Sequence, residues 1–92
     1  MYQATDLYFV AALIAYGANY HGVDRSVKRN QLFIFDDPLG VSKIFIKKAD
    51  GGVTVIENPT FEEIKHAFDT VVLMFTPNYT EAVRRIKGII NS

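Results

Sequence analysis

Basic side chains are the residues of this sequence best suited to binding chemistry. Six of the ten basic residues lie within residues 25–48, against two acidic ones. They are Arg25, Lys28, Arg29, Lys43, Lys47 and Lys48. Guanidinium and ammonium groups bind phosphate oxygens, and the rings of Tyr20, Phe33 and Phe45 could stack on bases beside them. The pattern predicts binding of single-stranded or other nucleic acid, on condition that the segment 43–48 lies beside the loop around Arg25.

Two simpler interpretations of these basic residues stand beside that prediction. Hairpin tips are polar by default, and lysines on an edge strand prevent unwanted strand pairing. A second basic group, Arg84, Arg85 and Lys87, is read as the solvated outer face of the last helix, where cations favour the C-terminal end.

Catalytic and metal-binding patterns have little support. His21 and His66 lie on different predicted elements, and neither belongs to a His-x-x-His or His-Glu-x-x-His pattern. Asp36 and Asp37 are neighbours on a strand, so their side chains point to opposite faces. The glycines at 51–52 lie in a predicted turn and do not open a helix that could hold a phosphate. We therefore expect a non-enzymatic protein without catalytic residues, metal or cofactor.

Length and composition predict one domain over residues 1–92. The chain is 49% hydrophobic with twelve aromatic residues, seven Phe and five Tyr, which is ample for a folded domain. Ten basic residues balance ten acidic ones, so attraction to an anionic partner must come from local clustering. The absence of cysteine excludes disulfides and thiolate chemistry and suits the cytoplasm.

Residues 6–16 are predicted to form an apolar helix, capped by Thr5 or Asp6 and ended by Gly17. The apolar run of ten residues is too short to span a bilayer, so no membrane association is expected. Almost no polar face remains, so either other helices or a second subunit must cover the helix. We expect a homodimer or a partner interface. Its predicted contact residues are Tyr8, Ala12, Ala15 and Tyr16.

Two antiparallel hairpins are predicted to follow. Residues 19–23 and 31–36 form one pair across the basic loop. Residues 42–48 and 53–56 form the second, across the turn signal Asp50-Gly51-Gly52.

Two helices complete the expected fold. Thr60 and Glu63 make a capping box that opens a helix at Phe61. Residues 70–75, "TVVLMF", fit either a strand or a continued helix, and Pro77 is predicted to begin the last helix. The fold class is therefore α+β, with a small antiparallel sheet of two hairpins covered by three helices in the order α-β-β-β-β-α-α.

Three blocks of the sequence resemble a family of short domains of unknown function, many of them encoded by bacteriophages and prophages. They are "TDLYFVAALIAYG" (5–17), "GVDRSVKRNQLFIFDD" (22–37) and "PNYTEAVRRIKGII" (77–90). Together they cover under half of the chain. Relative to the shorter members of that family, residues 39–58 look like an inserted β-hairpin.

The resemblance implies a viral or mobile-element setting, and hence the cytoplasm of a host cell. It supplies no reaction, cofactor or catalytic residue. Three functions follow as expectations. The leading one is nucleic-acid binding through the basic hairpin surface. The others are a protein-interaction module or inhibitor that docks on a host or defence protein, and a purely structural homo-oligomer.

Overall fold

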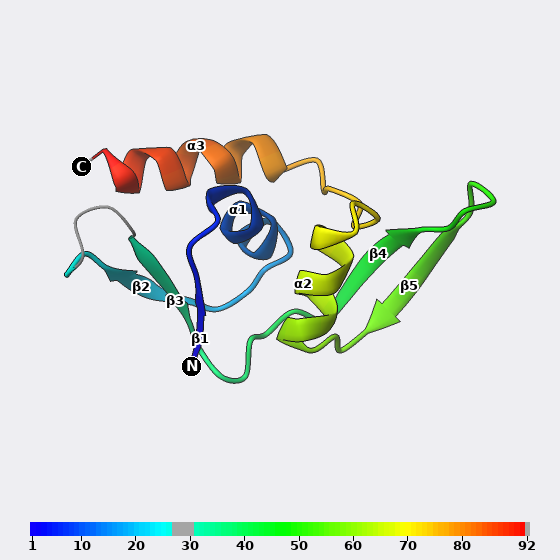
Figure 1. Cartoon of the computed structure of the whole chain (residues 1–92), viewed down its shortest axis with the longest axis horizontal. Coiled ribbons are helices and arrows are strands. Elements are labelled where there is room, and N and C mark those ends of the chain that lie inside the picture. Colours follow the sequence, from blue (N-terminus) through cyan, green and yellow to red (C-terminus); the bar gives the residue numbers. More distant parts are fainter. Residues whose placement is uncertain (27–30, 92) are drawn as a thin grey trace.

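The chain has the predicted α+β architecture, seen in a computed structural model that describes residues 1–26 and 31–91 (Figure 1). Those residues form two small antiparallel sheets and three helices. The elements are β1 (Tyr2–Ala4), α1 (Leu7–Ala15), β2 (Tyr20–Asp24), β3 (Leu32–Phe35), β4 (Lys43–Lys47), β5 (Val53–Glu57), α2 (Phe61–Asp69) and α3 (Tyr79–Ile90). The predicted element order is confirmed, with one additional strand at its start.

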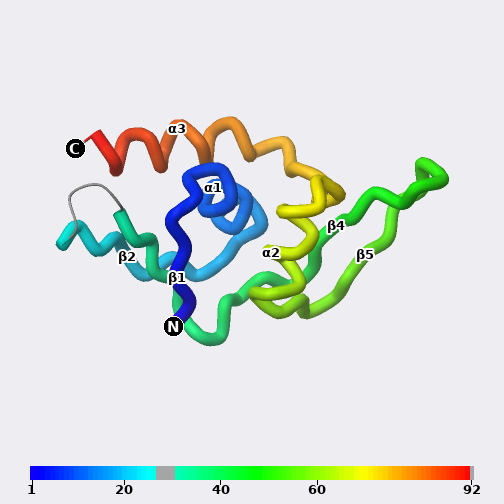
Figure 2. Tube along the Cα trace, viewed as in Figure 1, coloured from blue at the N-terminus to red at the C-terminus, as the bar shows by residue number. Residues whose placement is uncertain are grey.

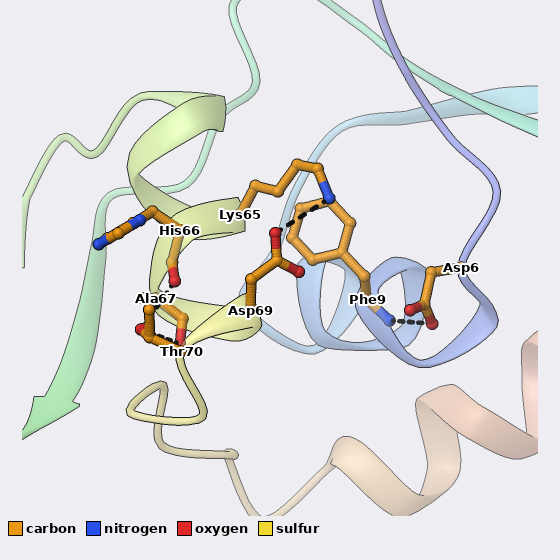
Figure 3. Close-up of polar contacts among 7 residues, drawn as sticks. All are labelled: Asp6, Phe9, Lys65, His66, Ala67, Asp69 and Thr70. Carbon is orange, nitrogen blue, oxygen red and sulfur yellow. Dashed lines mark hydrogen bonds and ion pairs between the residues drawn. The ribbon is translucent and has the colours of Figure 1, made fainter.

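The apolar helix α1 lies at the centre of the molecule. The side chain of Asp6 caps it, because Oδ1 accepts a hydrogen bond from the backbone N–H of Tyr8 at 2.9 Å and one from that of Phe9 at 3.3 Å. Figure 3 shows the bond to Phe9. Gly17 ends it with a φ of 89°. α3 lies along one side of α1 and the β1–β3 sheet along another (Figure 1). Elements of the same chain therefore cover the apolar surface.

The first sheet, sheet A, has the strand order β1-β3-β2, and all its neighbours are antiparallel. Phe33 and Phe35 of the central strand are buried in the core. The pairing of β2 with β3 confirms the first predicted hairpin. β1 was not predicted from the sequence. Tyr2 of this strand pairs with Phe35, and the Tyr2 ring stacks on the Phe61 ring with centroids 5.0 Å apart.

The second predicted hairpin, β4 with β5, forms a sheet of its own, sheet B. The expectation of one sheet containing both hairpins was therefore wrong. The edge of β3 away from β2 is taken by β1, so β4 cannot pair with β3. Sheet B instead projects from the opposite end of the molecule (Figures 1 and 2). Ile44 of β4 is fully buried in the common core.

Helix α2 packs between sheet B and α1. The predicted capping box is present: Thr60 N–H donates to Glu63 Oε1 at 2.9 Å, and Glu63 N–H donates to Thr60 Oγ1 at 3.1 Å. The Lys65 ammonium lies 5.5 Å from the Phe9 ring centroid and 3.3 Å from Asp69 Oδ2 (Figure 3).

The ambiguous segment 70–75 is neither a full strand nor a continued helix. α2 ends at Asp69, and Val71 takes a left-handed φ of 60°. The segment then runs beside β4, where Leu73 forms an isolated bridge with Ile46. α3 begins at Tyr79 and not at Pro77, because residues 76–79 first make a turn closed by Tyr79 N–H and the Thr76 carbonyl at 3.0 Å.

The Tyr16 hydroxyl joins three of these parts. It donates a hydrogen bond to the Met74 carbonyl and accepts one from the backbone N–H of Phe45 at 3.3 Å. The end of α1, strand β4 and the segment after α2 therefore meet at one phenol.

Candidate nucleic-acid interface

The six basic residues predicted to bind nucleic acid are divided between the two ends of the molecule. Arg25 follows β2 of sheet A, whereas Lys43 and Lys47 occupy the ends of β4 in sheet B, followed by Lys48. The hairpins lie at opposite ends of the longest axis, which measures 43 Å (Figure 1). Lys28 and Arg29 lie outside the described residues. The condition that segment 43–48 lies beside the Arg25 loop is therefore not met.

On sheet B, the lysines share a face with apolar side chains. Lys43, Phe45 and Lys47 alternate along β4 on the face away from α2, opposite Val55 and its neighbours on β5. The Lys43 ammonium lies 5.7 Å from the Phe45 ring centroid. This face is small and partly apolar, so it holds fewer cations than the predicted rim.

Arg25 makes its contact with the last helix. Its guanidinium donates a hydrogen bond to the Ile89 carbonyl in the last turn of α3. The C-terminal end of a helix carries partial negative charge, which favours a cation there. The contact brings the end of β2 against α3, although the two are far apart in sequence.

Tyr20, the first residue of β2, belongs to the same end of the molecule. Its ring packs edge-on against Phe35, with centroids 5.7 Å apart. Burial raises the pKa of the Tyr20 phenol, and the charges of Arg85 and Arg25 oppose that rise. Both guanidinium groups therefore act on the same phenol.

A surface hollow extends this junction along α3. It has a volume of about 430 Å³, and Ile14 of α1 forms part of its wall. The other lining residues are Asn78, Glu81, Ala82, Arg84 and Arg85. Asn78 Nδ2 donates to the Ala15 carbonyl at 3.3 Å and so fixes the start of α3 against the end of α1. We call Tyr20, Arg25, Arg84 and Arg85 the α3 basic surface.

Sequence reasoning assigned these cations to two unrelated groups. Helical spacing placed Arg84 and Arg85 on the outer face of α3, and both are exposed. No local pattern indicated that Arg25 would reach the same helix, because that contact depends on how sheet A packs on α3. The signal available in the sequence was only that each group lay on an exposed face.

The predicted interface residues of α1 are mostly covered within the chain. Ala12 is fully buried, and Ala15 and Tyr16 are half-buried. Only Tyr8, with 52% of its surface exposed, presents a ring to solvent. A homodimer seam along α1 would therefore have few side chains to use.

The described part of the chain contains no group of three or more His, Cys, Asp or Glu side chains that could hold a metal ion. None of its helices combines the length and apolar character needed to cross a membrane. Comparisons of the chain with protein-family models, curated proteins and solved structures found no match.

Proposed function

We propose that this chain is a non-enzymatic protein that binds single-stranded nucleic acid through the α3 basic surface. The observation that carries the proposal is the hollow that Arg84 and Arg85 line along α3, with the Arg25 guanidinium held on the last turn of the same helix. Arginines bind phosphates through two parallel hydrogen bonds, and an aromatic ring beside them can stack on an unpaired base. The resemblance to phage-encoded domains supports a setting in the cytoplasm of an infected host.

The electrostatics predict modest affinity. The chain has no net charge, and Glu81 lines the same hollow as the two arginines. Attraction therefore acts only over short distances and is screened at physiological salt, where the Debye length is about 8 Å. Binding should be strongest in dilute buffer and should fall steeply as salt is added.

A charge-matched pair of variants tests the assignment. Arg84→Ala with Arg85→Ala removes two cations from the α3 basic surface, and Lys43→Ala with Lys47→Ala removes two from sheet B. Fluorescence polarisation with a labelled single-stranded oligonucleotide, titrated at several salt concentrations, measures both. We expect the arginine variant to reduce the slope of log affinity against log salt by about 1.4, from roughly 0.7 per phosphate contact, and the lysine variant to leave it unchanged.

Two results would contradict the proposal. One is the absence of binding by the unaltered chain at low salt. The other is a larger loss in the lysine variant than in the arginine variant, which would move the interface to sheet B. A duplex of the same sequence serves as the control for strand state, and circular dichroism confirms that each variant is folded.

A second candidate function is docking on a host protein, and one surface favours it. The Phe75 and Tyr79 rings are stacked with centroids 4.2 Å apart, and the Tyr79 hydroxyl lies 3.5 Å from the Tyr8 carbonyl. Tyr8 and Phe75 are both about half exposed. Exposed aromatic side chains are typical anchors of protein interfaces. Capture of a host protein that is lost in Tyr8→Ala with Phe75→Ala, without oligonucleotide binding, would favour this function.

A further inference from the structure

The two edges of sheet B differ. The outer edge of β4 is covered: Lys47 N–H donates to the Val72 carbonyl at 2.8 Å, Met74 N–H donates to the Phe45 carbonyl at 2.9 Å, and Phe45 N–H reaches the Tyr16 hydroxyl. Among the strands of the described residues, β5 pairs with β4 alone. Within residues 1–26 and 31–91, no backbone group bonds to its far edge. β5 is therefore the open side of the sheet.

The hydrogen-bonding pattern of the β4–β5 hairpin shows which backbone groups of β5 point away from β4. Asn58 N–H donates to the Ser42 carbonyl at 2.7 Å, and Lys48 N–H donates to the Gly52 carbonyl at 2.8 Å. Bonded pairs alternate with non-bonded pairs along an antiparallel ladder, so the residues at 54 and 56 point their backbone groups toward β4. The N–H and C=O groups of Val53, Val55 and Glu57 consequently point outward.

This edge lacks the usual protection against strand pairing. Residues 53–57 contain no proline, lysine or glycine, and their register with β4 has no bulge. The edges of sheet A are protected, since β1 has only three residues and β2 carries an irregularity between Tyr20 and Gly22. Val53 and Val55 are 50% and 47% exposed. A regular edge with exposed valines, and with Glu57 as its one charged residue, is a template for another strand.

The edge is also complementary to itself. A two-fold axis through Val55 places Val55 against the same valine of a second copy, Thr54 against the second copy's Ile56, and Val53 against the second copy's Glu57. In this register the outward N–H and C=O groups of residues 53, 55 and 57 lie opposite the outward groups of residues 57, 55 and 53 of the second copy, as antiparallel hydrogen bonding requires. Valines lie together on one face, and no two like charges are opposite one another.

A groove beside the edge adds apolar surface that the same arrangement would cover. It has a volume of about 460 Å³, and Ile46 and Ile56 of sheet B form one wall. Its other lining residues are Glu62, Glu63, His66, Ala67, Thr70 and Val72. An axis perpendicular to the sheet keeps both α2 helices on one side, so the two grooves lie next to each other. Ile56 of the second copy then lies beside the groove of the first.

We infer that two copies of this chain associate through their β5 edges and form one continuous four-stranded sheet, β4-β5-β5-β4. The contact involves five residues of each strand and the adjoining groove walls. Stable complexes bury roughly 1,200 to 2,000 Å², and a contact built mainly on one five-residue strand edge is small by comparison, so we expect a weak, concentration-dependent dimer. The contact shares no residue with the α3 basic surface, and sheet B lies apart from β2 and α3 (Figure 1).

Single-cysteine variants test the register, because the natural chain has no cysteine. Val55→Cys places two thiols opposite each other across the axis, at a Cα separation of about 5.5 Å that a disulfide spans. Val53→Cys is the matched control, because residue 53 has a similar exposure. Residue 53 of the second copy lies four residues further along the paired strand, so the two thiols would be about 13 Å apart. Under mild oxidation at high protein concentration, we expect a disulfide-linked dimer for Val55→Cys and little for Val53→Cys. Equal cross-linking of the two would overturn the register.

A charge-based pair of variants tests the association itself. Val55→Lys places like charges opposite each other, and we expect it to raise the dimer dissociation constant roughly tenfold. Val53→Lys adds the same charge but opposite Glu57 of the second copy, so the dimer should be as stable or more stable. Sedimentation equilibrium between 10.4 kDa monomer and dimer measures both, up to millimolar chain concentration. A natural chain that stays monomeric throughout, with no Val55→Cys cross-link, would overturn the inference and leave the edge to a strand of another protein.

Discussion

At the scale of single residues, the Tyr16 hydroxyl connects segments that are far apart in the sequence. It accepts from Phe45 N–H and donates to the Met74 carbonyl, so one partly buried phenol satisfies backbone groups of two other segments. Removing the hydroxyl leaves both groups without that partner. Loss of the hydrogen bond of a partly buried polar group destabilises the fold more than loss of the hydrogen bond of an exposed group.

We expect Tyr16→Phe to lower the free energy of unfolding by about 1 to 3 kcal/mol, because the ring remains and only the hydrogen bonds are lost. Urea denaturation followed by circular dichroism measures the change. Tyr8→Phe is the control, since that side chain is half exposed and should have little effect. An unchanged midpoint for Tyr16→Phe would show that water replaces the hydroxyl.

The same residue predicts a signature in alkaline solution. Burial raises the pKa of Tyr16 above its ordinary value, against the opposing hydrogen bond from Phe45. The neutral phenol is thus favoured in the folded chain, and its contribution is complete below the unfolded pKa of about 10. This contribution to stability is lost as the pH rises above the unfolded pKa and through the pKa of the folded state. Tyr16→Phe should therefore weaken the alkaline decline in stability, although Tyr20 and Tyr79, whose pKa values are also raised, preserve part of it.

At the scale of elements, two helices end in the same backbone motif with different residues. After α1, Gly17 N–H bonds to the Ile14 carbonyl and Ala18 N–H to the Leu13 carbonyl. After α2, Val71 N–H bonds to the Phe68 carbonyl and the next N–H to Ala67. Both are Schellman motifs, which require a left-handed residue. Glycine takes that conformation without strain, whereas a β-branched valine does not.

We expect Val71→Gly to stabilise the chain by up to about 1 kcal/mol, because it removes the strain of a left-handed valine. Val71 is 84% exposed, so little packing is lost. Gly17→Val is the reciprocal change: a Cβ there would meet no atom within 4 Å, so its cost, about 1 to 2 kcal/mol, comes from the backbone alone. Thermal denaturation of both variants measures the difference. A destabilised Val71→Gly would mean that the valine side chain contributes contacts of its own.

Elements with local signals were predicted well from the sequence. The Asp6 cap and the Thr60–Glu63 capping box involve residues three positions apart or fewer, so both helix starts could be read directly. β1 could not, because three residues carry no usable period and the strand exists only through its pairing with β3. Pro77 misplaced the start of α3 by two residues, since the chain first makes a turn there.

At the scale of the whole molecule, the unpredicted feature is the separation of the hairpins into two sheets. Local alternation indicates that a segment is a strand, but not which strand will take each free edge. β1 occupies the edge of β3 that the predicted sheet needed. The candidate nucleic-acid site differs from the predicted one for the same reason. The lysines of β4 lie in the separate sheet B, and Arg25 contacts α3.

Sheet B should accordingly show a distinct hydrogen-exchange pattern. In dilute solution we expect slow exchange for the amides of Thr54 and Ile56, which point toward β4, and fast exchange for those of Val53 and Val55, which point outward. Phe33 and Phe35, buried in the central strand of sheet A, should exchange more slowly than either pair. Exchange resolved by NMR measures this alternation. Uniform protection along β5 in dilute solution would contradict the proposed open edge.

The hydrogen bond between Asn58 N–H and the Ser42 carbonyl, at 2.7 Å, has a further consequence for how the β4–β5 hairpin is attached. It means that the polypeptide enters and leaves the β4–β5 hairpin at almost the same point in space. Loss of residues 43–57 would therefore leave two adjacent chain ends, but it would also remove the buried Ile44 and the backbone partners that β4 gives to Val72 and Met74. The hairpin is thus joined to the rest of the chain at one point and held to it by its own packing.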